Sequence, residues 1–173
     1  MISLQSSLGF NRANVTSTTA FKAKKSAKKL EIFVAMPMGK DAKSRARWNR
    51  LNESIKAVSE PIGYTAARID DVLLENARSS ENQFIAQSIL NKIEKSNIVI
   101  ADLSEQNPNV YFELGYALGK GRKILPVAKK GTDLPFDVKD INTVFYTNMG
   151  ANLKQRLGSI LSVIYKNDMK DTK

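Results

Sequence analysis

Two spacings of apolar residues alternate along the chain, and together they predict strands and helices in alternation. Short apolar runs of strand length occur at 30–36, 64–69, 97–101, 123–127 and 142–147. Between them, apolar side chains recur every three or four residues over 41–60, from Ser79 towards Asn97, over 108–118 and over 153–164. Five strands that alternate with helices predict an α/β three-layer sandwich around a five-stranded parallel, flavodoxin-like (Rossmann-like) sheet.

A parallel sheet of this kind brings residues from distant parts of the chain to one rim. Right-handed crossover connections place the carboxyl ends of all the strands on the same side. In open α/β sheets ligands bind at that side. The residues that we expect to converge there are Met36, Pro37, Asp70, Asp71, Asp102, Glu113, Lys129 and Asn148.

The turns after the first two strands each allow two interpretations. The turn from Met36 through Pro37 to Gly39 could direct backbone N–H groups at an anion, or it could be a plain strand-to-helix turn. Asp70 and Asp71 follow the second strand and could bind sugar hydroxyls or a cation. They could equally cap the next segment, so both alternatives stay open.

A cluster of cations lies at the front of the helix predicted for 41–60. Positive side chains near a helix start oppose the helix dipole. The cluster therefore indicates a mobile first turn or a nearby anion, although a solvated basic face is the simpler explanation. Its members are Lys43, Arg45, Arg47 and Arg50.

Glu113 is the notable residue of the helix that Asn107 and Pro108 begin. Asn is a good N-cap, and Pro at the first helical position loses no hydrogen bond. Glu113 follows in the second turn between Phe112 and Leu114, with no Lys or Arg three or four residues later. It is either a solvated helix residue or a functional carboxylate.

The segment ADLSEQNPNVYFELGYALGKGRKILPV at 101–127 resembles the signature of the nucleoside 2-deoxyribosyltransferase-like superfamily. That group includes deoxyribosyltransferases, deoxynucleotide N-glycosidases and TIR-like nucleotide-binding proteins. The resemblance extends over about residues 30–147, and its TIR-like branch also matches IFVAMP in the first strand. The resemblance implies that Glu113, the Glu of the ELG triplet, is the nucleophile that attacks the anomeric carbon of the sugar.

The resemblance and the expected rim together assign roles to several further residues. Asp102 lies on the same rim and could hold sugar hydroxyls, and Asn107 matches a phosphate-contacting Ser of nucleotide-hydrolysing relatives. Asn109 flanks the helix start, and the start of that helix would favour the ionised form of Glu113. Tyr111 and Phe112 could stack on a base, or either could belong to the core.

One position departs from the deoxyribosyltransferase pattern. That branch has an Asp eight residues before the position of Asn97, whereas this chain has Ile89. Protonation of the leaving base is therefore in doubt, unless Asp70 or Asp71 supplies the proton. The favoured hypothesis is N-glycosidic bond hydrolysis or deoxyribosyl transfer. The alternative is a TIR-like module that binds NAD or a signalling nucleotide without turnover.

Composition limits the chemistry that remains. The 173 residues suit one domain of ordinary size, and the chain contains neither Cys nor His. Disulfides, thiol chemistry and a His base are therefore excluded, and we expect neither a metal ion nor another cofactor. The expected partners are a small nucleoside or nucleotide and further copies of the chain. No apolar run approaches membrane-spanning length, so we expect a cytoplasmic protein.

The formal charge of +10 is concentrated near the N-terminus. Residues 1–30 carry six Lys and Arg and no acid. We interpret 1–29 as a flexible basic extension, 30–166 as the α/β domain and 167–173 as a frayed tail. Only the basic extension could bind nucleic acid; packing on another subunit and organelle targeting are its further alternatives.

Overall fold

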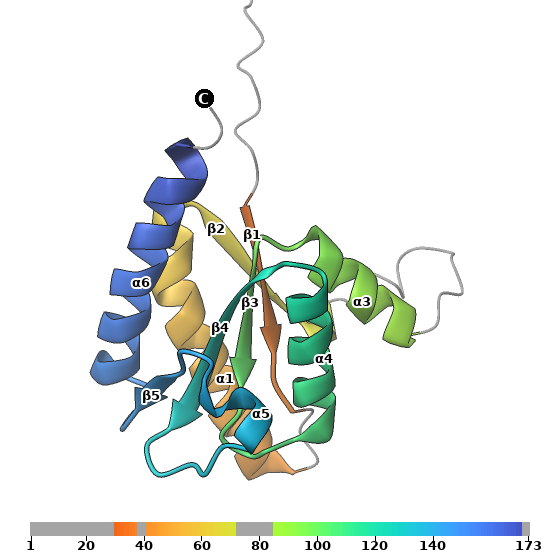
Figure 1. The fold of residues 1–173 in the computed structure, drawn as a ribbon. Helices are drawn as coiled ribbons and strands as arrows, with labels where there is room; N and C mark the ends of the chain where they lie inside the picture. The colour runs from red at the N-terminus through yellow and green to blue at the C-terminus, as the bar shows by residue number, and fades with distance from the viewer. Residues whose placement is uncertain (1–29, 38–40, 72–84, 171–173) are drawn as a thin grey trace, which may run out of the picture.

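The computed structural model describes residues 30–37, 41–71 and 85–170, and its centre is a five-stranded sheet. The strands lie in the order β2-β1-β3-β4-β5, and all neighbouring pairs are parallel (Figure 1). This arrangement confirms the predicted flavodoxin-like α/β fold. The strands are β1 (Leu30–Ala35), β2 (Tyr64–Arg68), β3 (Ile98–Asp102), β4 (Lys123–Lys129) and β5 (Val144–Tyr146).

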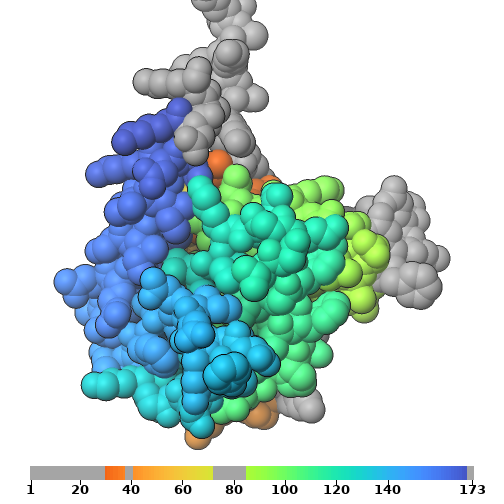
Figure 2. Space-filling model, viewed as in Figure 1, coloured from red at the N-terminus to blue at the C-terminus, as the bar shows by residue number. Residues whose placement is uncertain are grey.

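Helices cover both faces of the sheet. One face packs against α1 and α6, and the other packs against α3 and α4, with residues around α5 beside them. Figure 2 shows the second face in space-filling form, where α3, α4 and the segment around α5 lie side by side. The helices are α1 (Ala42–Ser59), η1 (Glu60–Ile62), α3 (Ile85–Lys95), α4 (Pro108–Gly119), α5 (Phe136–Lys139) and α6 (Ala151–Lys170).

The alternation of side chains along each strand explains the two cores. Ile98 and Ile100 of β3 belong to the cluster under α1 and α6, whereas Val99 and Ala101 belong to the cluster under α3 and α4. Every residue of β3 is buried, as expected for a central parallel strand with helices on both sides. β3 therefore ends in a fully enclosed position, and its last residue is Asp102.

Side-chain caps begin two of the helices, and the cap of α4 is the predicted one. The side chain of Asn107 caps α4 by accepting a hydrogen bond from the backbone N–H of Asn109 at 2.9 Å, and Pro108 occupies the first helical position. Asp41 caps α1 by accepting from the N–H of Ser44 at 2.9 Å. These caps set where each helix begins relative to the strand end before it.

Two elements near the C-terminus differ from the sequence prediction. The sequence pattern predicts no regular element between 127 and 142, but α5 begins at Phe136, and a single turn is too short to show a helical period. The closing helix continues past Ile164 to Lys170, and the hydroxyl of Tyr64 donates to Asp168 in its last turns at 3.0 Å. The expectations for residues 1–29, Gly39 and 72–84 fall outside the described residues. None of the described helices is both long and apolar enough to span a membrane.

Gly63 supplies a first testable feature, because it links η1 to β2 with a φ of +100°. A Cβ at this position would lie 3.3 Å from the ring of Tyr165. Gly63→Ala should therefore lower the free energy of unfolding by more than the about 1–2 kcal/mol of a left-handed Ala. Urea denaturation measures the loss.

Gly121→Ala is the matched control for this substitution. Gly121 also has a positive φ, of +64°, but among the described residues no atom beyond its chain neighbours lies within 4 Å of a Cβ built there. Gly121→Ala should therefore lose only the free energy that a left-handed Ala costs. Equal losses in the two variants would mean that the Tyr165 ring yields space, which contradicts the prediction.

Candidate active site

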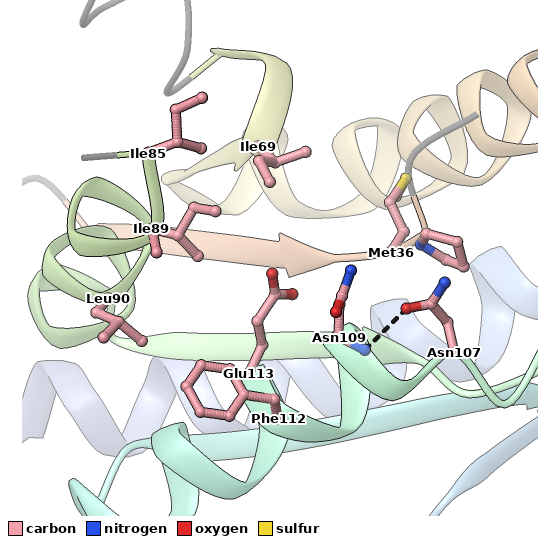
Figure 3. Close-up of a pocket in the computed structure, with 11 residues that line it drawn as sticks. Met36, Ile69, Ile85, Ile89, Leu90, Asn107, Asn109, Phe112 and Glu113 are labelled. Carbon is pink, nitrogen blue, oxygen red and sulfur yellow. Dashed lines mark hydrogen bonds between the residues drawn. The ribbon is translucent and has the colours of Figure 1, made fainter. Parts of the chain in front are cut away.

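A cavity of about 460 Å³ opens at the carboxyl end of β1, between α3 and α4. Cavities of this size hold nucleoside-sized ligands. Asn107, Asn109 and Glu113 contribute its polar side chains (Figure 3). The rest of its lining is apolar and comes from Met36, Pro37, Ile69, Ile85, Ala86, Ile89, Leu90 and Phe112.

The carboxylate of Glu113 extends into this cavity (Figure 3). The residue is only 7% exposed, and no hydrogen-bond or ion-pair partner for it lies among the described residues. Burial raises the pKa of Glu113 to about 7. The direction of this pKa shift is opposite to the expectation that the helix start would favour the ionised form.

The packing of α4 on the sheet places Glu113 there. Val110, Leu114 and Ala117 recur at helical spacing and are buried against the sheet. Glu113 precedes Leu114 and therefore lies at the edge of the buried stripe, facing the cavity. Phe112 lies further round the helix, and although it lines the cavity it is 61% exposed.

Asp102 does not line the cavity, because other protein groups surround it. Its side chain is fully buried and accepts a hydrogen bond from Arg47 of α1 at 2.9 Å. The hydroxyl of Ser104 also donates to it, at 2.6 Å. Arg47 in turn bonds Glu105 at 2.9 Å and the hydroxyl of Tyr146 at 3.1 Å. The cation cluster at the start of α1 suggested a nearby anion. For Arg47 that anion is the carboxylate of Asp102.

The paired acids after β2 lie beside the Glu113 cavity and not on it. Asp71 accepts from the backbone N–H of Arg68 at 2.8 Å, and Asp70 pairs with the Arg68 side chain. Asp70 and Arg68 line a second cavity, of about 310 Å³, whose wall of Met36, Pro37 and Ile69 is shared with the first. Its other lining residues are Arg45, Trp48 and Asn49.

The structure thus brings together half of the predicted site. Met36, Pro37, Asn107, Asn109 and Glu113 line one cavity. Tyr111 instead lines a separate groove beside α5, and its buried hydroxyl has no partner among the described residues.

Sequence reasoning missed the apolar wall formed by Ile69, Ile85 and Leu90. The apolar period of 84–93 was the available signal, but it was used only to predict a helix. For metal binding, the described ranges hold no group of three or more Asp and Glu side chains arranged as ligands.

Comparisons with known proteins agree with this architecture. The profile of the family described as nucleoside 2-deoxyribosyltransferase matches residues 4–156. The CMP N-glycosidase BcmB of Clostridium botulinum superposes with a TM-score of 0.53 at 15% identity, over 73% of this chain and 97% of its own. A 2-deoxyribosyltransferase of Bacillus psychrosaccharolyticus superposes at 0.51 and 12% identity, over 69% and 87%. At these identities the superpositions show the fold alone. No curated protein matches the sequence.

The contact between Arg47 and Asp102 gives a prediction for stability. Arg47→Met should lower the free energy of unfolding by about 3 kcal/mol, because it leaves a buried carboxylate unpaired. Adding Asp102→Asn should restore most of the loss. Arg50→Met, at an exposed position of the same helix, is the control. If urea denaturation shows equal losses for Arg47→Met and Arg50→Met, the ion pair does not stabilise the fold.

Burial of Glu113 predicts a pH-dependent stability. Its folded pKa of about 7 lies above the ordinary 4.5, so the native state disfavours the ionised form. The wild-type protein should lose up to about 3 kcal/mol between pH 4.5 and pH 7 through this group. Glu113→Gln should therefore be more stable than wild type at pH 8, and the difference should shrink towards pH 4.5.

Urea unfolding at pH 5 and pH 8 measures this difference. Glu53→Gln, on the exposed face of α1, is the matched control. A gap between Glu113→Gln and wild type that is the same at both pH values would contradict the assignment of a raised pKa to Glu113.

Proposed function

The chain belongs to the nucleoside 2-deoxyribosyltransferase family, and from that premise we propose that it cleaves the N-glycosidic bond of a nucleoside or nucleotide. Glu113 is the nucleophile in this proposal. The observation that carries it is a buried carboxylate without a partner among the described residues, directed into a nucleoside-sized cavity. The names of two structural neighbours, a CMP N-glycosidase and a 2-deoxyribosyltransferase, are consistent with this chemistry.

The geometry suits a two-step displacement at the anomeric carbon. As the bond to the base lengthens, the sugar acquires oxocarbenium character, which a nearby carboxylate stabilises and then attacks. Water releases the sugar in hydrolysis, and a second base accepts it in transfer. The apolar walls limit water around Glu113 and so strengthen its interaction with the developing positive charge.

The start of α4 is the proposed site for the polar parts of the substrate. Asn107 and Asn109 lie on the cavity within one turn of each other, and their amides can bond to sugar hydroxyls or a phosphate. Asp102 is assigned a positioning role in place of sugar contact, because its bonds to Arg47 and Ser104 hold the loop that leads into α4.

The prediction of a homo-oligomer is kept in this proposal. Phe112 and Leu118 of α4 are 61% and 53% exposed, and Phe136 of α5 is 83% exposed. Large exposed apolar side chains are typical of association surfaces. A second copy that covers Phe112 would lie next to the rim of the Glu113 cavity.

The alternative is a module that binds NAD or a signalling nucleotide without cleaving it. One observation favours it: among the described residues, Glu113 is the single ionisable side chain that lines the cavity. Ligand binding to the wild-type protein without release of base would support this alternative.

Release of free base from deoxynucleotides, ribonucleotides and NAD tests the proposed activity. Glu113→Gln should reduce release by more than about 10³-fold, because the nucleophile is lost. In the wild type, kcat/KM should rise between pH 5 and pH 8 with a midpoint near the pKa of Glu113, about 7, because only the ionised carboxylate attacks. Chromatography of the products measures both effects.

Glu53→Gln is the control for activity and should behave as wild type. Circular dichroism of Glu113→Gln separates loss of chemistry from loss of fold. Turnover that survives in folded Glu113→Gln would remove Glu113 from the nucleophilic role.

A further inference from the structure

The acids that the structure describes near the Glu113 cavity are already engaged elsewhere. Asp70 pairs with Arg68, and Asp71 accepts from the backbone of residue 68. Asp102 is enclosed by its contacts with Arg47 and Ser104. In the part of the chain that the structure describes, the wall that faces Glu113 is made of Ile69, Ile89 and Leu90.

This arrangement separates two classes of leaving group. A neutral base that leaves from an N-glycosidic bond takes the bonding electron pair and needs a proton, which a general acid usually supplies. Such an acid accelerates the reaction by about 10²–10⁴-fold. A base that is already a cation becomes neutral as it leaves and needs no acid.

We propose that the cavity serves N-glycosides whose base carries a positive charge, such as an N-ribosyl pyridinium or an N7-alkylated purine. This inference rests on the proposed function and names the substrate class of the same site. The apolar wall opposite Glu113 offers no proton donor among the described residues, and substrates of this class require none.

Electrostatics favours the same class. Glu113 is only 7% exposed, and no cation among the described residues compensates its carboxylate. A cationic base supplies that missing charge, and the attraction is strong where water is scarce. The Phe112 ring lies beside Glu113 and can contact the face of a cationic ring (Figure 3). A neutral base would leave the ionised carboxylate buried without a partner.

The proposed reaction balances with water as the only co-reactant. The bond from the anomeric carbon to the base nitrogen breaks, and its electron pair neutralises the positive nitrogen. A Glu113 oxygen bonds to the anomeric carbon and forms a glycosyl ester. Water then attacks that carbon and displaces the Glu113 carboxylate, and one proton passes to solvent.

Guanosine and 7-methylguanosine form a matched pair that tests this inference. They differ by one methyl group and by the charge of the base. Each is assayed as the nucleoside and as the 5′-monophosphate, with the rate without protein subtracted, and nicotinamide riboside and cytidine serve as a second cationic and neutral pair. The kcat/KM for the cationic member should exceed that for the neutral member by about 100-fold or more.

The outcomes separate this inference from the proposed function. Comparable rates for cationic and neutral substrates would overturn the inference and leave the proposed function intact. Release of base from neither class would overturn the inference, and the proposed function falls with it only if deoxynucleosides and deoxynucleotides also release no base. If a neutral substrate is cleaved rapidly and that activity is lost in Glu75→Gln or Glu81→Gln, an acid outside the described residues protonates the base, and the inference fails.

Ile89→Asp provides a gain-of-function test, because it adds a carboxyl group to the wall that faces Glu113. It should raise the ratio of the guanosine rate to the 7-methylguanosine rate by about 10-fold or more. Ile89→Asn, of the same shape but without an acid, is the matched control and should raise neither rate. An equal increase in both variants would contradict the missing-acid explanation, and circular dichroism verifies that both are folded.

Discussion

The packing of α4 against the buried central strand is the constraint on which the site depends. Three apolar side chains hold this helix to the sheet, at Val110, Leu114 and Ala117. Glu113 lies three residues after Val110 and four before Ala117, so it shares their side of the helix and is only 7% exposed. The same contacts that stabilise the domain therefore keep a carboxylate in a poorly solvated place. The reactivity proposed for Glu113 is a consequence of core packing, since no specific bond within the described residues holds its side chain.

Two buried carboxylates that lie close in sequence differ in whether hydrogen-bond donors compensate their charge. Asp102 is fully buried and is surrounded by donors from Arg47 and Ser104, so its charge is compensated. Glu113 is nearly as buried and has no such donors among the described residues. One acid therefore serves the architecture, because it joins α1 to the end of β3, while the other is left available for a ligand.

The elements of the fold were predictable because their signals are local. The β-branched runs and the spacing of Val110, Leu114 and Ala117 reveal strands and a helix without knowledge of distant contacts. The apolar neighbours of Glu113 argued against a solvated position but left that alternative open. α5 escaped prediction because one turn contains too few residues for a period to show.

The roles of the aspartates were not predictable, since they depend on side chains brought together by folding. Topology places Asp70, Asp71 and Asp102 on one rim, but it does not say which way each side chain turns. The orientation of Asp102 is set by Arg47, which lies 55 positions away in the chain, and that of Asp70 by Arg68.

The wall shared by the two cavities affects the length of ligand that the site can hold. The thioether of Met36 is unbranched and adopts several rotamers at little cost, so rotation of one side chain could admit a longer molecule that extends from Glu113 towards Arg45 and Arg68. The length of ligand that the site can hold then depends on the rotamer of Met36, and it can change without any change in the sheet.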